Sequence, residues 1–181
     1  MKTIKWIAFG IIVALTIMYV AKGIWTTEAS ATETHWVVVE TGTVSMIESL
    51  KPELDPSIRS QIANTVDVVC TEQNLPVELV LAIMCRESSF RTMAVSSMQC
   101  VGLMQINPKA HPALCEPYTW AELYHIQPNI EIGCRILKEY LKSSDSIQKA
   151  LSRYVGGNHN GYVTDVLAIY AELKLTQGVK S

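Results

Sequence analysis

A nearly unbroken apolar run, residues 79–84, leads into the charged pair Arg86 and Glu87. Residues three and four apart share one face of a helix, so Glu87 continues the apolar stripe of Ile83 and Met84. Burial disfavours the charged form of a carboxyl group and raises its pKa. A carboxyl group that stays protonated near neutral pH is a candidate general acid. The alternative is a glutamate that ends the helix and turns into solvent or pairs with a neighbouring arginine.

Helix-start signals recur along the chain and indicate an all-α domain of about six helices, with no convincing sheet. Proline at the first helical position and Asp, Ser or Thr as N-cap are typical of helix starts. The predicted starts are Asp55-Pro56 for a helix to about Gln73, Pro76 for the helix of Glu87, the capping box Thr119–Glu122, Pro128, and Ser144 or Asp145, with a last helix after a turn at residues 156–161.

The composition favours one globular domain. The chain has 181 residues, of which 49% are hydrophobic, which is enough for one sizeable core. A net charge of −2 argues against nucleic acid as the main partner, because such domains usually carry a strongly basic face. The four histidines are scattered and no cysteine pair has zinc-site spacing, so we predict neither a metal nor a cofactor.

The N-terminus resembles an export signal. Lys2 and Lys5 precede an apolar run, residues 6–21, and a small-residue cleavage site follows at residues 29–31. We therefore expect residues 1–31 to be a signal peptide or an uncleaved signal anchor, in which residues 6–25 would hold the protein in the inner membrane. Residues 32–54 would then form a linker or N-terminal arm, and residues 55–181 an exported periplasmic or cell-envelope domain.

The five cysteines become candidates for disulfides in an exported protein. They are Cys70, Cys85, Cys100, Cys115 and Cys134. One must remain unpaired within the chain, and four cysteines can form two bridges in three ways, among which the sequence does not choose.

Three separated segments together resemble the soluble lytic transglycosylase type of peptidoglycan-cleaving enzymes, which have a lysozyme-like fold. Residues 87–90 (Glu-Ser-Ser-Phe) match the family's Glu-Ser-x-Phe/Tyr motif, whose glutamate is catalytic. Residues 102–108 (Gly-Leu-Met-Gln-Ile-Asn-Pro) are close to its Gly-Leu-Met-Gln-Ile-x-Pro motif. Residues 151–157 and 161–167 resemble its Ala-Tyr-Asn-x-Gly and Tyr-Val-x-x-Val-Leu segments. The resemblance covers residues 56–174 and implies a goose-type-lysozyme-like helical fold.

The chain departs from the family pattern in its third segment. The usual Tyr-Asn is Tyr154-Val155 here, so any role of that asparagine in ordering the site or binding sugar is lost, or moved to Asn158 or Asn160. Cys100 stands where the family usually has a small residue.

By resemblance, the enzyme cleaves the β-1,4 bond between N-acetylmuramic acid and N-acetylglucosamine. Protonated Glu87 would donate a proton to the leaving oxygen and then accept one from the C6 hydroxyl, giving a 1,6-anhydro product without water. Ser96, Met104 and Gln105 would contact the glycan, with Gln105 as a hydrogen-bond donor. Tyr154 would pack against Glu87 or hydrogen-bond to it, and Tyr162 is interpreted as a core residue.

Two alternatives remain open from the sequence. A goose-type-lysozyme-like hydrolase would cleave the same bond with water as nucleophile. Glycosidases usually use a second carboxylate as nucleophile or as base for water. Asp165 or Glu131 could fold near Glu87, although neither follows it closely in the chain. A catalytically dead peptidoglycan-binding or assembly module is the other alternative. The expected partners are peptidoglycan strands, with cell-envelope-spanning machinery as a further candidate.

Overall fold

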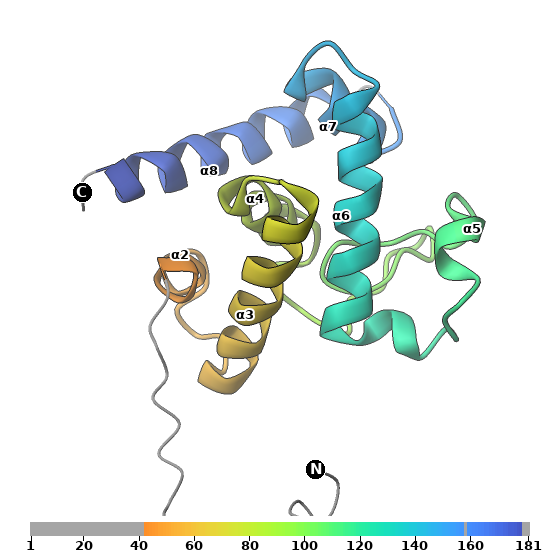
Figure 1. The fold of residues 1–181 in the computed structure, drawn as a ribbon, viewed down its shortest axis with the longest axis horizontal. Helices are drawn as coiled ribbons and strands as arrows, with labels where there is room; N and C mark the ends of the chain where they lie inside the picture. Colours follow the sequence, from red (N-terminus) through yellow and green to blue (C-terminus); the bar gives the residue numbers. More distant parts are fainter. Residues whose placement is uncertain (1–41, 158, 179–181) are drawn as a thin grey trace, which may run out of the picture. The chain divides into compact units, whose positions relative to one another are not determined.

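The computed structural model describes residues 42–157 and 159–178. The elements in chain order are α2 (Gly42–Leu50), α3 (Pro56–Gln73), α4 (Val77–Ser88), α5 (Pro112–Cys115), the 3₁₀ helix η1 (Glu122–Tyr124), α6 (Ile126–Lys142), α7 (Ile147–Tyr154) and α8 (Asn160–Gly178) (Figure 1). No strand forms within these residues; isolated β-bridges join Val101 to Val95 and to Ile106. The predicted all-α class is therefore confirmed.

The predicted signal or anchor, residues 1–31, lies outside the described residues. In the part of the chain that the structure describes, no helix combines the length and the apolar character needed to cross a bilayer.

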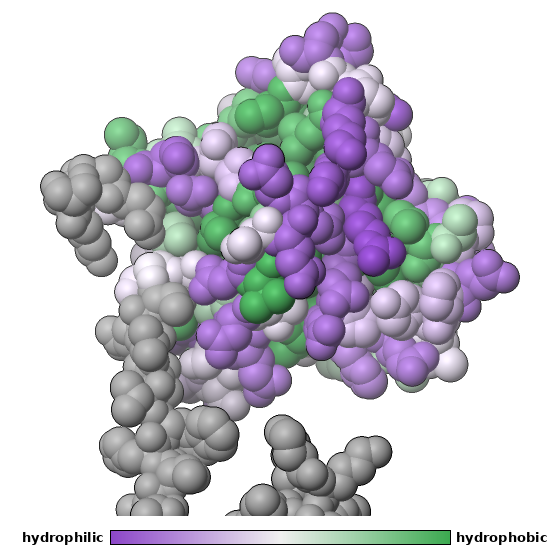
Figure 2. Space-filling view, in the orientation of Figure 1, coloured by the Kyte–Doolittle hydropathy of each residue, from purple (hydrophilic) through white to green (hydrophobic). Residues whose placement is uncertain are grey.

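Helix α4 lies at the centre of the packing. All residues from Leu79 to Met84 are buried, which matches the apolar run in the sequence. The helix packs against α8, α3 and α2, and α6 packs against α3, α7 and η1. Figure 1 shows α8 passing across α4 and α6 running alongside α3. On the face of the molecule shown in Figure 2, hydrophobic residues form small patches that are separated by hydrophilic residues.

The local start signals explain α3 and α4. The Asp55 carboxylate accepts hydrogen bonds from the backbone N–H groups of Ser57 and Ile58, at 2.9 and 3.1 Å, and satisfies donors at the start of α3. Asn74 ends α3 in the left-handed conformation, and Ser89 ends α4 in the same way. Glu87 is thereby fixed in the last turn of α4.

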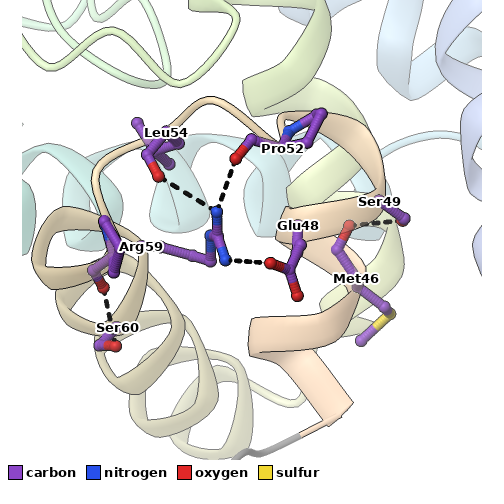
Figure 3. Close-up of polar contacts among 8 residues, drawn as sticks. Met46, Glu48, Ser49, Pro52, Leu54, Arg59 and Ser60 are labelled. Atoms are coloured by element: carbon purple, nitrogen blue, oxygen red, sulfur yellow. Dashed lines mark hydrogen bonds and ion pairs between the residues drawn. The ribbon is translucent and has the colours of Figure 1, made fainter.

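Part of the predicted N-terminal arm, residues 32–54, is the helix α2. The Arg59 guanidinium reaches back from α3 to this helix (Figure 3). Its Nη1 donates to the Glu48 carboxylate at 2.6 Å, and its Nη2 donates to the carbonyl oxygens of Pro52 and Leu54 at 2.9 and 3.1 Å. One side chain on α3 thus holds both α2 and the loop that follows it.

Helix starts in the second half differ in detail from the prediction. The Thr119–Glu122 capping box forms, with two 2.7 Å hydrogen bonds to the Glu122 carboxylate, but it opens only the three-residue η1, because His125 is extended. Helix α6 begins at Ile126, two residues before Pro128. The N-cap of α7 is Ser146, whose hydroxyl accepts from the N–H of Lys149, and not Ser144 or Asp145.

Candidate active site

Glu87 lies where α4 ends beneath α8, partly buried. The hydroxyl of Tyr162, on α8, donates a 2.7 Å hydrogen bond to its Oε1. Burial raises the pKa of Glu87 above its ordinary 4.5, while the Tyr162 hydrogen bond and the positive charge of Arg86 oppose part of that rise. The carboxyl group therefore holds its proton to a higher pH than an exposed glutamate, as a general acid requires.

Tyr162 is itself a fixed donor. It is 6% exposed, and burial, the Glu87 charge and the hydrogen bond to Glu87 raise its pKa well above the ordinary 10. The hydroxyl consequently keeps its proton when Glu87 is ionised, and it can donate that proton in a hydrogen bond to the carboxylate.

An ion pair flanks this hydrogen bond. The Nε of Arg86 lies 3.0 Å from Oδ2 of Asp165, and both side chains are about half exposed. The Arg86 guanidinium also lies over the ring of Tyr162, 5.7 Å from its centroid. Tyr162 and Asp165 are three residues apart on α8 and so share one face of the helix. One face of α8 thus carries both Tyr162, which donates to Glu87, and Asp165, which pairs with Arg86.

The segment after Glu87 is tied to the core by two buried polar side chains. The hydroxyl of Ser88 donates to the carbonyl oxygen of Leu103 at 2.9 Å. The carbonyl oxygen of Met84, at 3.2 Å, is also within hydrogen-bond distance of this hydroxyl. Asn129, which is fully buried on α6, accepts from the N–H of Met104 at 2.8 Å and donates to the carbonyls of Val101 and Leu123, at 3.0 and 2.7 Å. The Gly-Leu-Met-Gln segment is therefore a rigid wall beside the end of α4.

Two glycines permit this close packing. Gly102 has φ +76°, and a Cβ there would lie 2.1 Å from Nδ2 of Asn129. A Cβ on Gly133 of α6 would lie 2.4 Å from the sulfur of Met104 and 2.7 Å from its Cβ. Only glycine fits at either position without a shift of the neighbouring chain.

Tyr154, the last residue of α7, is directed at the same segment. Its hydroxyl donates to the carbonyl of Met104 at 3.0 Å. Burial raises the pKa of Tyr154 well above the ordinary 10, and the nearby charges of Glu87 and Tyr162 add to the rise. The hydroxyl of Tyr154 therefore bonds to the Met104 carbonyl, and the hydrogen bond to the Glu87 carboxylate comes from Tyr162.

The remaining predicted contact residues lie around this segment. Met104 is fully buried in the core against Gly133. Gln105 adopts φ +48°, and its Nε2 donates to the carbonyls of Gly102 and Ala94 at 3.1 and 3.3 Å. The hydroxyl of Ser96 accepts from the N–H of Cys100 at 3.1 Å and closes a turn. Their predicted contacts with a glycan stay predictions.

Sequence reasoning missed three contributors to the site: Tyr162, Asp165 as the partner of Arg86, and Asn129. Tyr162 was interpreted as core, and it is buried, but its hydroxyl is directed at Glu87. The three-residue spacing of Tyr162 and Asp165 was the available signal. Of the proposed substitutes for the missing asparagine, Asn160 is exposed at the start of α8, and Asn158 lies outside the described residues.

Other features of the surface do not add to this site. A cavity of about 580 Å³ lies between residues 51–58 and the loop Ser89–Val95, but Glu87 is not among the residues that line it. Across residues 42–157 and 159–178, no group of three His, Cys, Asp or Glu side chains could hold a metal ion. The raised pKa of Glu87 suits its carboxyl group to proton transfer.

Comparison with known proteins agrees with this geometry. The family model described as "Transglycosylase SLT domain" matches residues 67–163, just over half of the chain. The crystal structure of the 70 kDa soluble lytic transglycosylase from Escherichia coli is similar, with a TM-score of 0.60 and 17% sequence identity. The match covers 75% of this chain but 29% of that protein, so the likeness shows the fold, and the predicted lysozyme-like helical architecture is confirmed. Comparison with curated proteins gave no significant match.

Proposed function

The chain belongs to the transglycosylase SLT domain family, as its motifs predicted, and on that premise we propose that it is a peptidoglycan lytic transglycosylase. It would cleave the β-1,4 bond between N-acetylmuramic acid and N-acetylglucosamine and leave a 1,6-anhydro-N-acetylmuramic acid end. The observation that carries the proposal is the partly buried Glu87, with a raised pKa and a fixed donor on its Oε1.

In the first step, protonated Glu87 donates its proton to the glycosidic oxygen. The bond from this oxygen to C1 of the muramic acid breaks, the leaving sugar departs with a new hydroxyl, and an oxocarbenium-like sugar remains. The hydrogen bond from Tyr162 stabilises the carboxylate that forms in this step, because a donor favours the charged state of a carboxyl group.

In the second step, Glu87 acts as the base. It takes the proton of the C6 hydroxyl while the C6 oxygen bonds to C1, so Glu87 regains its proton and no water is consumed. One carboxyl group therefore suffices, since the sugar supplies its own nucleophile. The two candidate second carboxylates are engaged elsewhere, which supports this assignment over a two-carboxylate hydrolase. Asp165 pairs with Arg86, and the Glu131 carboxylate accepts a hydrogen bond from Gln127.

The supporting residues act on either side of Glu87. We assign Tyr154 to the exclusion of water beside the carboxyl group, where a drier site strengthens polar contacts. We assign Gln105 and Ser96 to contacts with the glycan. Met104 contributes its backbone N–H and carbonyl to the hydrogen bonds that hold the Gly-Leu-Met-Gln segment beside Glu87. Residues 1–31 would direct the protein to the periplasm or cell envelope as a signal peptide or anchor. An envelope-spanning machine is a candidate partner there.

The test is product analysis on purified sacculi. Wild-type protein should release muropeptides with anhydro ends, and Glu87→Gln should reduce the rate by about 10²–10⁴-fold while the protein stays folded. Glu72→Gln, an exposed residue of α3, is the matched control and should keep full activity.

Mass spectrometry separates the alternatives. Reducing-end muramic acid, heavier by one water, would assign the chain as a goose-type-lysozyme-like hydrolase. No release from sacculi, together with retained binding to them, would assign it as a binding or assembly module. Near-normal release by Glu87→Gln would remove Glu87 from the mechanism.

A further inference from the structure

Two cysteines that the site does not use face each other across a helix pair. Cys70 lies on α3 and Cys134 on α6, and their side chains are 1% and 0% exposed. These two helices pack directly on one another (Figure 1). The α3–α6 contact therefore holds both cysteines in the buried core, and the Cys70 side chain and burial both raise the pKa of the Cys134 thiol.

An independent contact fixes how the helices face each other. Gln73 of α3 donates from its Nε2 to the backbone carbonyl of Glu131 of α6 at 3.3 Å. Gln73 is three residues after Cys70, and Glu131 is three residues before Cys134, so each shares a helix face with its cysteine. The faces that carry the two cysteines are therefore the faces in contact.

The other cysteines lie on different elements. Cys85 is on α4, Cys100 in the loop before the Gly-Leu-Met-Gln segment, and Cys115 on α5. Cys70 and Cys134 are thus the pair that the contact between α3 and α6 favours.

We propose that Cys70 and Cys134 are oxidised to a disulfide that ties α3 to α6 when the protein folds in an oxidising compartment. The inference goes beyond the proposed function, and depends on it only for where the oxidant is encountered. The two sulfurs are not bonded to each other in the structure.

The oxidant is a disulfide donor, either a protein thiol–disulfide oxidoreductase or glutathione disulfide. One cysteine thiolate attacks a donor sulfur, which breaks the donor S–S bond and releases one donor thiolate. The second cysteine thiolate then attacks the mixed disulfide and releases the other. Two protons leave the cysteines, and two electrons end on the donor, which is reduced to two thiols.

Burial sets the time at which this reaction occurs. With both sulfurs inside the core, a donor cannot reach them once α3 and α6 have packed. Oxidation therefore accompanies folding, and the finished bond is protected from reductants. Protein that has folded reduced should react slowly, whereas protein that folds with the donor present should be oxidised.

The experiment is refolding of the full chain from the reduced, unfolded state in a glutathione–glutathione disulfide buffer, followed by alkylation and a double digest. Cleavage by trypsin and a glutamyl endopeptidase places each cysteine on its own peptide. Cys70 lies on residues 60–72, Cys85 on 79–86, Cys100 on 92–109, Cys115 on 110–122 and Cys134 on 132–135. We expect 60–72 linked to 132–135, and a melting temperature roughly 5–10 °C above that of the reduced protein.

Two sets of variants make the result specific. Cys85→Ala and Cys115→Ala should leave the linked peptide and the shift in melting temperature unchanged. Cys70→Ala and Cys134→Ala should each abolish both. Recovery of 60–72 and 132–135 as separate alkylated peptides, or linkage of either to another cysteine, would overturn the proposal even if the core variants failed to fold, because that readout is made on the wild-type chain.

Discussion

The hydroxyl of Tyr162 lies 2.7 Å from Oε1 of Glu87, and this one hydrogen bond joins the end of α4 to the start of α8. It connects residues 75 positions apart in the chain. A donor that stays protonated beside a carboxyl group with a raised pKa gives Glu87 a fixed direction and a stabilised charged state.

Tyr162→Phe should raise the pKa of Glu87 further, because it removes the hydrogen bond that lowers it. The limb on which activity falls with rising pH should move to higher pH. The maximal rate should fall about 10- to 100-fold, since a hydrogen bond to a charged group contributes about 1.5–3 kcal/mol. The measurement is the pH profile of muropeptide release.

Tyr170→Phe is the matched control, because Tyr170 lies on the same helix about two turns further on. Its pH profile should overlay that of wild type. An unshifted profile for Tyr162→Phe would mean that the hydroxyl does not act through Glu87.

Glu87→Gln should change how stability depends on pH. The pKa of Glu87 is raised in the folded state, so the folded protein binds this proton more tightly than the unfolded chain does. Its contribution to stability is complete below the ordinary pKa of 4.5 and is lost as the pH rises through the raised pKa. As the pH rises from 4 to 8, wild type should lose this contribution and the variant should not. The urea midpoint of the variant should therefore rise relative to that of wild type over this range. A constant difference across that range would contradict the raised pKa.

Asn129→Ala should lower the free energy of unfolding by about 3 kcal/mol. The substitution leaves a cavity and removes partners from three buried backbone groups, those of Val101, Met104 and Leu123. The Gly-Leu-Met-Gln wall should loosen, so amide hydrogen exchange at Met104 should accelerate more than at α3. Uniform acceleration over the whole domain would argue that Asn129 acts on global stability alone.

Gly133→Ala and Gly161→Ala should have opposite effects. The methyl group at Gly133 would overlap Met104, and we expect a loss of about 1–3 kcal/mol of stability. Gly161, in the first turn of α8, has open space around its missing Cβ, so alanine there should add up to about 1 kcal/mol. Thermal unfolding of the two variants in parallel measures both, and equal effects would refute the packing argument.

Local signals in the sequence predicted the elements whose causes are local. Asp55 and Pro56 start α3, and the apolar run before Glu87 becomes the buried stripe of α4. The N-cap of α7 was misplaced because Ser144, Asp145 and Ser146 can each cap a helix, and only the packing of α7 selects Ser146.

Contacts between segments that are distant in the chain could not be predicted from the sequence. Which tyrosine reaches Glu87 depends on the angle at which α8 crosses α4, and the sequence around Glu87 does not predict that angle. Asn129 was overlooked for a similar reason, because its three hydrogen-bond partners lie 6 to 28 residues away in the chain. The sequence alone does not distinguish a buried asparagine on a helix from an exposed one.

The contact between Arg59 and Glu48 bears on where a stable fragment of this protein can begin. A fragment that starts at residue 55 would keep Arg59, which is 7% exposed, but would lack Glu48 and the Pro52 and Leu54 carbonyls that neutralise and solvate it. A bare cation against an apolar interior is costly, so such an excised piece should aggregate or unfold. A fusion of this domain to another protein should therefore place the junction ahead of Gly42.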